Sequence, residues 1–141
     1  MADSIAIREL RDDERPWAEA RYRAIQFAAT PAGSVALVAE RAGARIGLGR
    51  LVAHAPGVVE LGGIWTDEAA RGLGVARAMV EALLGRAGPG ARLWCIPFVH
   101  LARFYQSCGF APAAPPWPPA IAAKVAECIA HALPEVVVLG R

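Results

Sequence analysis

Apolar and polar residues follow a strand-like order through most of the first half of the chain. Ser4–Leu10 alternates apolar and polar positions, which is typical of a half-buried strand. Val35–Glu40 and Ile46–Val52 flank a short turn at residues 41–44, and this arrangement predicts a β-hairpin. After Pro56 and Gly57 begin a new segment, Val58–Thr66 is predicted to form a central strand.

One helix is predicted between the first strand and the hairpin. Asp12 or Asp13 is expected to cap it, the helix starts at about Glu14, and Pro31 with Gly33 ends it. Helical spacing gathers one set of residues on a common face: Trp17, Arg21, Ala24, Ile25 and Ala28.

The second half alternates helices with strands. Helices are predicted at Gly72–Ala87, at His100–Cys108 and at about Pro119–Leu133. Strands are predicted at Arg92–Ile96 and Glu135–Leu139. Strands first and strand–helix alternation afterwards predict a mixed α/β fold, which we expect to form one domain over residues 1–141.

Composition excludes several classes of protein. Apolar residues make up 55% and charged residues 20% of the chain, the opposite of a disordered protein. No stretch approaches the roughly 20 uninterrupted apolar residues of a transmembrane helix, and no signal peptide is visible. The net charge of +2 comes from scattered residues, which argues against a nucleic-acid binder. We therefore expect a cytoplasmic protein that binds neither membrane nor nucleic acid.

The cysteines and histidines give no support for a disulfide or a metal site. The three cysteines form no CxxC pair, so free thiols are expected. The three histidines lie far apart, and none is spaced from a cysteine or carboxylate as zinc ligands are.

The stretch between the central strand and the next helix is suited to binding phosphate. Gly72 and Gly74 allow backbone N–H groups to face outward at the start of a helix, whose partial positive charge favours an anion. Arg71 and Arg77 can add charge-assisted contacts, and Ala76 keeps the first turn slim. A Walker loop and a dinucleotide-binding loop both fail to match. A glycine-rich helix start that only turns the chain remains an alternative.

Two motifs together resemble the GNAT superfamily of acyl-CoA N-acyltransferases. Arg71, Gly74 and Ala76 match its signature at a strand-to-helix turn, and the segment Arg103–Phe110, RFYQSCGF, is similar to its FYxxxGF segment. The resemblance implies a mostly antiparallel, twisted sheet of about six or seven strands, splayed at the fourth strand and flanked by about four helices. It also implies transfer of an acetyl group from acetyl-CoA to an amine, without a metal.

In this family the splayed strand pairs with the pantetheine arm of CoA through its backbone. Gly62 and Gly63 suit a bulge there, although simple close packing would also explain them. The resemblance thus assigns the CoA-binding residues to the end of this strand and the turn after it: Ile64, Trp65, Thr66, Arg71, Gly72, Leu73, Gly74, Val75, Ala76 and Arg77.

The resemblance also suggests two catalytic residues. Tyr105 is the candidate acid that protonates the CoA sulfur, with a packed tyrosine as the alternative. Glu60 is the candidate base, because an amine with a pKa near 10 must lose a proton. Strand alternation is expected to place Glu60 on one face with Val58, Gly62 and Ile64, leading toward the thioester. An alternative places Glu60 at a strand end in solvent or beside an arginine. His54 and His100 are further candidates for the base.

Two other functions remain open from the sequence. A non-catalytic acyl-CoA sensor is favoured by Phe98, which stands where the family often has asparagine. An interaction domain is suggested by the segment Pro115–Pro118, although we expect its Trp117 to pack inward. The acceptor is a small molecule or protein amine that the sequence does not identify, and the protein is expected to be a monomer or a homodimer.

Overall fold

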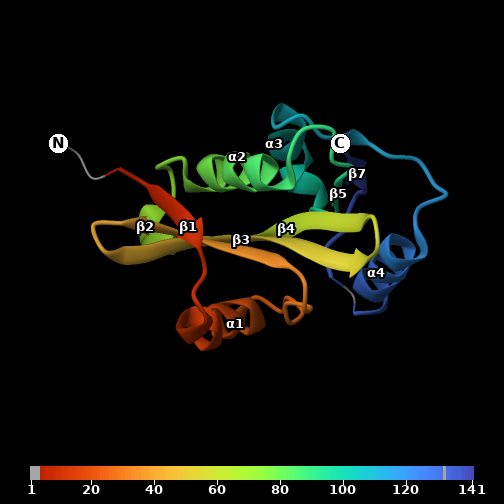
Figure 1. The fold of residues 1–141 in the computed structure, drawn as a ribbon. Coiled ribbons are helices and arrows are strands. Elements are labelled where there is room, and N and C mark those ends of the chain that lie inside the picture. The colour runs from red at the N-terminus through yellow and green to blue at the C-terminus, as the bar shows by residue number, and fades with distance from the viewer. Residues whose placement is uncertain (1–3, 132) are drawn as a thin grey trace.

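A computed structural model describes residues 4–131 and 133–141, which form a seven-stranded sheet with four α-helices (Figure 1). The strand order is β1-β2-β3-β4-β5-β7-β6, and every neighbouring pair is antiparallel except β4 and β5. The strands are β1 (Ala6–Glu9), β2 (Val35–Arg41), β3 (Ala44–Ala55), β4 (Val58–Thr66), β5 (Trp94–Cys95), β6 (Ala111–Pro112) and β7 (Leu139–Gly140). The helices are α1 (Arg15–Ala24), α2 (Val75–Ala87), α3 (Ala102–Ser107) and α4 (Pro119–Ala130). The predicted mixed architecture is confirmed.

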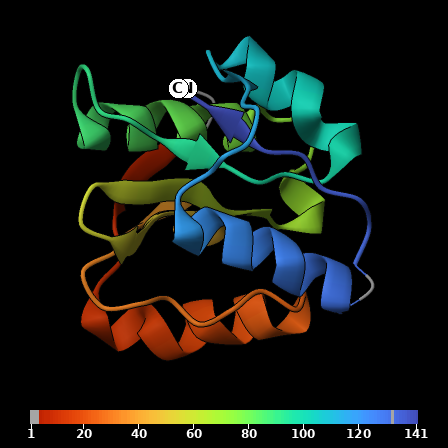
Figure 2. The ribbon, with the colours of Figure 1, turned by 90° about the vertical axis from the view of Figure 1, so that its right-hand side faces the viewer.

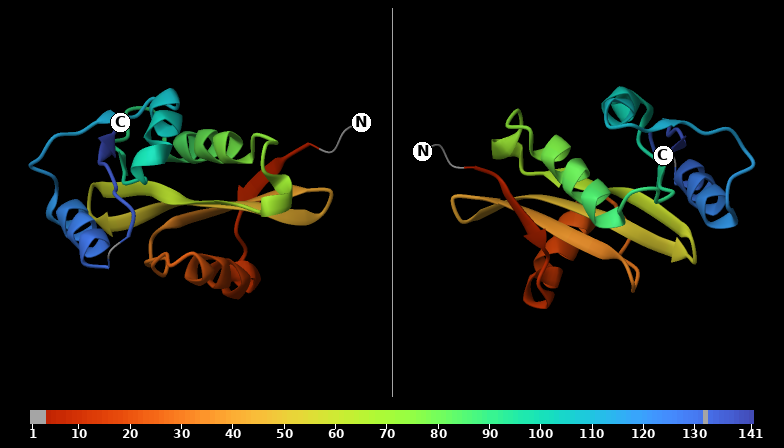
Figure 3. Two further views of the ribbon diagram at one scale, coloured as in Figure 1. Left: turned by 180° about the vertical axis from the view of Figure 1, so that it is seen from behind. Right: turned by 45° about the horizontal axis from the view of Figure 1, so that its top comes forward.

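Helices cover both faces of the sheet, with α1 on one side and α2 on the other (Figures 1 and 3). The larger core lies under α2, where Met79, Val80 and Leu83 are buried against the strands because they share one helix face. A smaller cluster under α1 includes Ala18 and Tyr22. Strand β4 therefore runs between two helices that are each packed against the sheet.

The hairpin and the central strand form where the alternation predicts them. Strands β2 and β3 pair across a tight turn, in which Ala42 and Gly43 both have positive φ. Strand β4 has the predicted bounds. No helix in the described part of the chain is both long and apolar enough to cross a membrane.

Helix α1 differs from the prediction at both ends. Asp12 and Asp13 belong to a preceding 3-10 helix, and the N-cap residue, Glu14, makes no side-chain capping bond. The helix ends at Ala24, and Gln26 has a positive φ of 62° soon after it. The predicted face also differs, because Ala18 and Tyr22 provide the buried side chains.

Helix α4 packs across the end of the sheet where β3 turns into β4 (Figure 2). Ile121 of α4 is fully buried with Trp94 of β5 and Val138. Trp117 packs against the same cluster, and its indole N–H donates to the carbonyl oxygen of Ala113 at 2.9 Å. The proline-rich segment thus places its tryptophan inward, as expected.

Candidate functional site

Strand β4 separates from β5 after a short contact. Within the described residues, Glu60 and Trp94 form the one register pair between these strands, and β5 then pairs with β7. Beyond Glu60, residues 61–66 of β4 pair only with β3, which lies on the edge opposite β5. Their backbone groups on the β5 side therefore have no strand partner, and the predicted splay at the fourth strand is confirmed.

A β-bulge interrupts β4 at the splay. Arg50 of β3 pairs with Gly62 and Leu48 pairs with Trp65, so β4 carries one more residue than β3 between the two pairs. Gly63 has a φ of 60°, a conformation that favours glycine. The two glycines therefore mark a bulge, as the sequence predicts.

The bulge changes which side chains share a face of the strand. Glu60 and Ile64 would lie on one face of a regular strand, as we expected. In the structure Ile64 packs in the core under α2, whereas Trp65 packs with Trp17 on the side of α1. The expected common face of Glu60 and Ile64 is therefore wrong, because the extra residue inverts the alternation.

The turn between β4 and α2 presents free backbone donors. Gly72 and Gly74 have φ values of 83° and 81°, and a Cβ added at either would meet nothing within 4 Å. The first helical bond runs from Ala78 N–H to the Gly74 carbonyl, and no side chain of residues 4–131 or 133–141 caps the helix. The N–H groups of Val75–Arg77 consequently remain available, which fits a phosphate group at the helix N-terminus.

The remaining residues of this turn differ in what they can contribute. Arg71 and Leu73 are exposed, whereas Val75 is buried. Arg77 donates to the Ser107 hydroxyl at 2.8 Å, and its guanidinium lies over the Phe104 ring. Arg77 therefore links α2 to α3, while Arg71 keeps its charge at the turn.

Glu60 is buried in a cluster of three charged or titratable groups. Both of its carboxylate oxygens accept hydrogen bonds from Lys124 Nζ, at 2.6 and 2.7 Å, and His54 Nε2 lies 2.7 Å from Oε1. Burial by itself raises the pKa of the Glu60 carboxyl, but the bond from His54 and the charge of Lys124 outweigh it and hold the pKa below its ordinary value. Neither a solvated Glu60 nor an arginine pair describes this arrangement.

Tyr105 lies at the edge of the core between two aromatic rings. It is 7% exposed and makes edge contacts with Phe104 and Phe110. Burial raises the pKa of its phenol, with smaller effects from Cys95 and Cys108, so the hydroxyl keeps its proton at neutral pH. No hydrogen bond joins this hydroxyl to any residue that the structure describes, which leaves the proton free for another acceptor.

Lys124 was not recognised as a site residue from the sequence. It lies 64 positions from Glu60 in a helix that the family motifs do not include. One signal was nevertheless present, because Lys124 is the only lysine in the chain, beside fourteen arginines.

Comparison with known families adds to this geometry. The model of the acetyltransferase (GNAT) family matches residues 4–110, about three quarters of the chain. The chain belongs to the GNAT acetyltransferase family. Membership supports acyl-CoA-dependent N-acyltransfer as the general activity of this protein. A comparison with curated protein sequences gave no match.

Solved structures share the fold of this GNAT domain at low sequence identity. An acyl-CoA N-acyltransferase from Pseudomonas aeruginosa is 16% identical, with a TM-score of 0.68 and 99% of each chain covered. An IAA acetyltransferase from Bacillus cereus is 17% identical, with a TM-score of 0.68. The match covers 97% of this chain and 98% of the Bacillus cereus chain. An N-acetylglutamate synthase from Neisseria gonorrhoeae, complexed with coenzyme A and N-acetyl-glutamate, is 16% identical with a TM-score of 0.74. This chain covers 35% of that synthase and is itself 98% covered.

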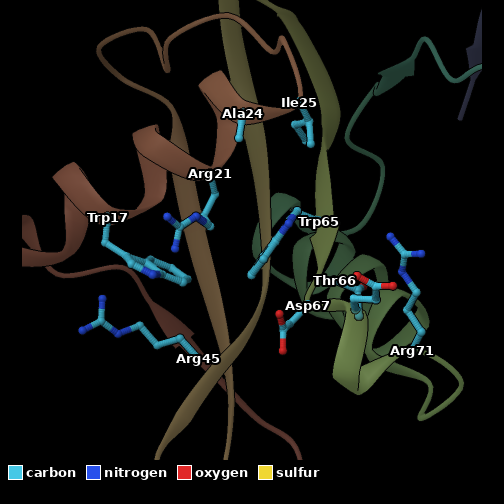
Figure 4. A pocket seen from close by; sticks show the side chains of 10 residues that line it. Trp17, Arg21, Ala24, Ile25, Arg45, Trp65, Thr66, Asp67 and Arg71 are labelled. Atoms are coloured by element: carbon cyan, nitrogen blue, oxygen red, sulfur yellow. The ribbon is translucent and has the colours of Figure 1, made fainter.

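A cleft of about 450 Å³ opens between α1 and the second half of β4 in this GNAT domain (Figure 4). Trp17 and Trp65 meet edge to face at its wall, with ring centroids 5.8 Å apart. Arg21, Arg45 and Arg71 line the cleft together with Asp67 and Glu68. Of the residues predicted to share a helical face with Trp17, three also line this cleft, namely Arg21, Ala24 and Ile25, whereas Ala28 does not.

Proposed function

We propose that this protein is an N-acetyltransferase that moves an acetyl group from acetyl-CoA to a primary amine by direct attack in a ternary complex. The observation that carries the proposal is the continuity of β4 with the phosphate turn. A strand edge without a partner among the described residues leads, through residues 67–74, to free N–H groups at the start of α2. Such a path can hold an extended pantetheine arm at one end and a pyrophosphate at the other.

The donor is held mainly by backbone groups in this proposal. Residues Ile64–Thr66 pair with the pantetheine arm, and the turn Arg71–Arg77 receives the pyrophosphate. The bulge at Gly63 turns the N–H groups of β4 towards the thioester, where they can polarise its carbonyl. Holding both reactants in this way supplies a large part of the rate enhancement.

Protons leave the acceptor amine by way of Glu60 and His54. Glu60 is the proposed base, but its side chain is 3% exposed, so it needs a route for the proton to reach water. His54 provides that route, since it touches Glu60 and is 18% exposed. Tyr105 is the proposed acid that protonates the departing CoA sulfur, because its hydroxyl has no hydrogen-bond partner among the described residues and can donate to the thiolate.

The cleft beside Trp65 is the proposed entrance for the acceptor. It lies on the side of α1 and reaches the bulge through Trp65. Arg21 and Arg45 line it on the side of Trp17, apart from Arg71 (Figure 4), so an acceptor that bears a carboxylate or phosphate can pair with them. The panel of acceptors should therefore include amino acids and amino phosphates beside amines without an anionic group.

Steady-state rates over that panel test the proposal. Amine-dependent release of CoA thiol is expected, with the N-acetylated amine identified by mass spectrometry. Direct attack predicts intersecting lines when both substrates are varied, whereas an acetyl-enzyme on the reaction path would give parallel lines. Parallel lines would contradict the ternary complex, and acetyl-CoA turnover that no amine accelerates would contradict transfer.

A second candidate is an acyl-CoA sensor without turnover. The observation that favours it is the engagement of both Glu60 oxygens by Lys124, which leaves the candidate base occupied. A sensor would bind acetyl-CoA and release no thiol with any amine, so the same rate measurements separate the two functions.

A further inference from the structure

Lys124 places a primary amine against the proposed base of an acetyltransferase. Its Nζ donates to both oxygens of Glu60, at 2.6 and 2.7 Å. An acceptor amine must make the same kind of contact before it can give up a proton. Lys124 therefore already holds the position relative to Glu60 that the proposed function requires of a substrate.

The choice of lysine at this position is unusual for this chain. Arginine occupies every other Lys or Arg position, fourteen in all, and the one lysine is the residue that contacts Glu60. Arginine is the usual partner in a buried bidentate pair with a carboxylate, because its planar guanidinium matches both oxygens. An ion pair with Glu60 therefore does not explain why position 124 is lysine and not arginine. Acylation does explain it, because it requires an amine that can lose its proton.

The amine also lies close to the bulge where the thioester is proposed to bind. A Cβ built on Gly62 would lie 3.2 Å from Glu60 Oε2, and Lys124 Nζ lies 2.7 Å from the same oxygen. The side chain of Lys124 is 33% exposed, so it retains room to move. Ile121, one turn earlier in α4, fixes the helix in the core.

We propose that Lys124 is a self-acetylation site, at which the protein transfers an acetyl group from acetyl-CoA to its own Nζ. The inference rests on the proposed function, since it uses the same thioester and the same base. The modification is intramolecular, because Glu60 and Lys124 belong to one chain and are in direct contact.

The reaction balances without any further reactant. A proton passes from the Lys124 ammonium to Glu60, and the free amine attacks the thioester carbonyl carbon. A C–N bond forms, the C–S bond breaks, and the sulfur leaves with the electron pair. Of the two protons lost by the nitrogen, one ends on the CoA sulfur and the other reaches water through Glu60 and His54.

Acetylation changes the surroundings of Glu60. The amide that results carries no charge, so Glu60 loses one of its two partners and keeps His54. One carboxylate oxygen becomes available to an acceptor amine. We therefore expect the acetylated protein to turn over external amines faster than the unmodified protein does.

Intact-mass and peptide analysis of the purified protein incubated with acetyl-CoA alone tests the proposal. The expected result is a gain of one acetyl group per chain at Lys124, with one equivalent of CoA thiol released. The rate per chain is independent of protein concentration. Lys124→Arg keeps the charge and abolishes both the mass gain and the thiol burst.

Three further variants separate catalysis from spontaneous chemistry. Gly74→Asp places a negative charge at the phosphate turn and is expected to prevent the modification, while Gly90→Asp, at another exposed glycine with positive φ, leaves it intact. Glu60→Gln removes the proposed base and is expected to slow a catalysed reaction, whereas a spontaneous one does not need this carboxylate. Some Lys124 could already be acetylated when the protein is isolated. The acetylated fraction is therefore measured in wild type and in Gly74→Asp isolated in the same way, and we expect it only in wild type.

The outcomes are distinct from those that test the proposed function. Acetyl-CoA binding with turnover of an external amine but an unmodified Lys124 overturns this inference and leaves the proposed function standing. Equal modification in wild type and Gly74→Asp, or modification that is not slowed in Glu60→Gln, also overturns it. Absence of acetyl-CoA binding to the wild type removes both proposals together.

Discussion

The hydroxyl of Tyr22 donates a hydrogen bond to the carbonyl oxygen of Gly63 at 2.9 Å. This bond joins α1 to the bulge of β4 across 41 positions of sequence. Arg50 lies over the Tyr22 ring at 4.1 Å, so the same tyrosine also covers a buried guanidinium. The conformation of the proposed thioester-binding backbone thus depends on a residue of α1.

Tyr22→Phe tests this dependence. The variant leaves the buried Gly63 carbonyl without its donor, so we expect a loss of about 1–3 kcal/mol in the free energy of unfolding. Denaturant titration measures it. We also expect weaker acetyl-CoA binding, because the bulge loses its fixed geometry. Unchanged stability and unchanged binding would show that the bulge holds its shape without Tyr22.

The bulge glycine itself should tolerate no side chain. Ala at position 63 would place its Cβ 2.7 Å from Arg50 Nε and 2.9 Å from the Tyr22 hydroxyl, at a φ of 60°. Gly57→Ala is the matched control, since Gly57 has a φ of 74° but open space around it. We expect Gly57→Ala to cost about 1–2 kcal/mol for the backbone alone, and Gly63→Ala to cost about 1–3 kcal/mol more for the overlap. Equal costs for the two variants would contradict the packing described here.

Acid should weaken the attachment of β1 to the segment before α1. Arg8 makes two hydrogen bonds to the Glu14 carboxylate, at 2.7 and 2.9 Å, and these lower the pKa of Glu14 from 4.5 to about 2 despite its burial. A lowered pKa stabilises the fold above pH 4.5, and the stabilisation is lost as pH falls from 4.5 towards 2.

Glu14→Gln is therefore expected to cost about 2 kcal/mol at pH 7, and the difference from wild type closes as pH falls through that range. Asp12→Asn serves as the control, because the Asp12 side chain is 94% exposed and its pair with Arg15 should contribute little. Thermal unfolding at several pH values measures both variants. A cost for Glu14→Gln that is independent of pH would contradict the assignment.

Tyr105→Phe separates a catalytic tyrosine from a packed one. Its hydroxyl has no hydrogen-bond partner among the described residues, so the variant should keep the stability of the wild type. The loss of a positioned acid is expected to lower kcat about 100-fold and leave KM for acetyl-CoA nearly unchanged. Unchanged kcat would reduce Tyr105 to its packing role against Phe104 and Phe110.

Local patterns predicted the elements around the proposed site well. Strand β4 has the bounds expected at Val58 and Thr66, because a Pro-Gly pair precedes it and a polar turn follows it. The splay and the bulge also followed from local features, the glycine pair and the family motifs. These features depend on residues that are close in sequence, which is why one chain suffices to recognise them.

Contacts between distant segments could not be predicted in the same way. Glu60 and Lys124 have no common periodicity, and the packing of Ile121 and Val125 is what brings α4 to the start of β4. The predicted closing strand Glu135–Leu139 is wrong in its bounds, because β7 includes only Leu139 and Gly140, where pairing with β5 and β6 places it. The end of α1 at Ala24 was also not predicted. The sequence has no proline or glycine between residue 25 and Pro31, so no local signal marks this helix end.

Calorimetric titration of acetyl-CoA into the protein tests the central claim most directly. Wild type and Gly90→Asp are expected to bind with micromolar affinity. Gly74→Asp is expected to bind at least tenfold more weakly, because its carboxylate repels the pyrophosphate at the start of α2. Both substitutions fall at exposed glycines with positive φ and open surroundings, so they differ only in position. Failure of the wild type to bind, or equal binding by all three proteins, would contradict a phosphate site at this turn.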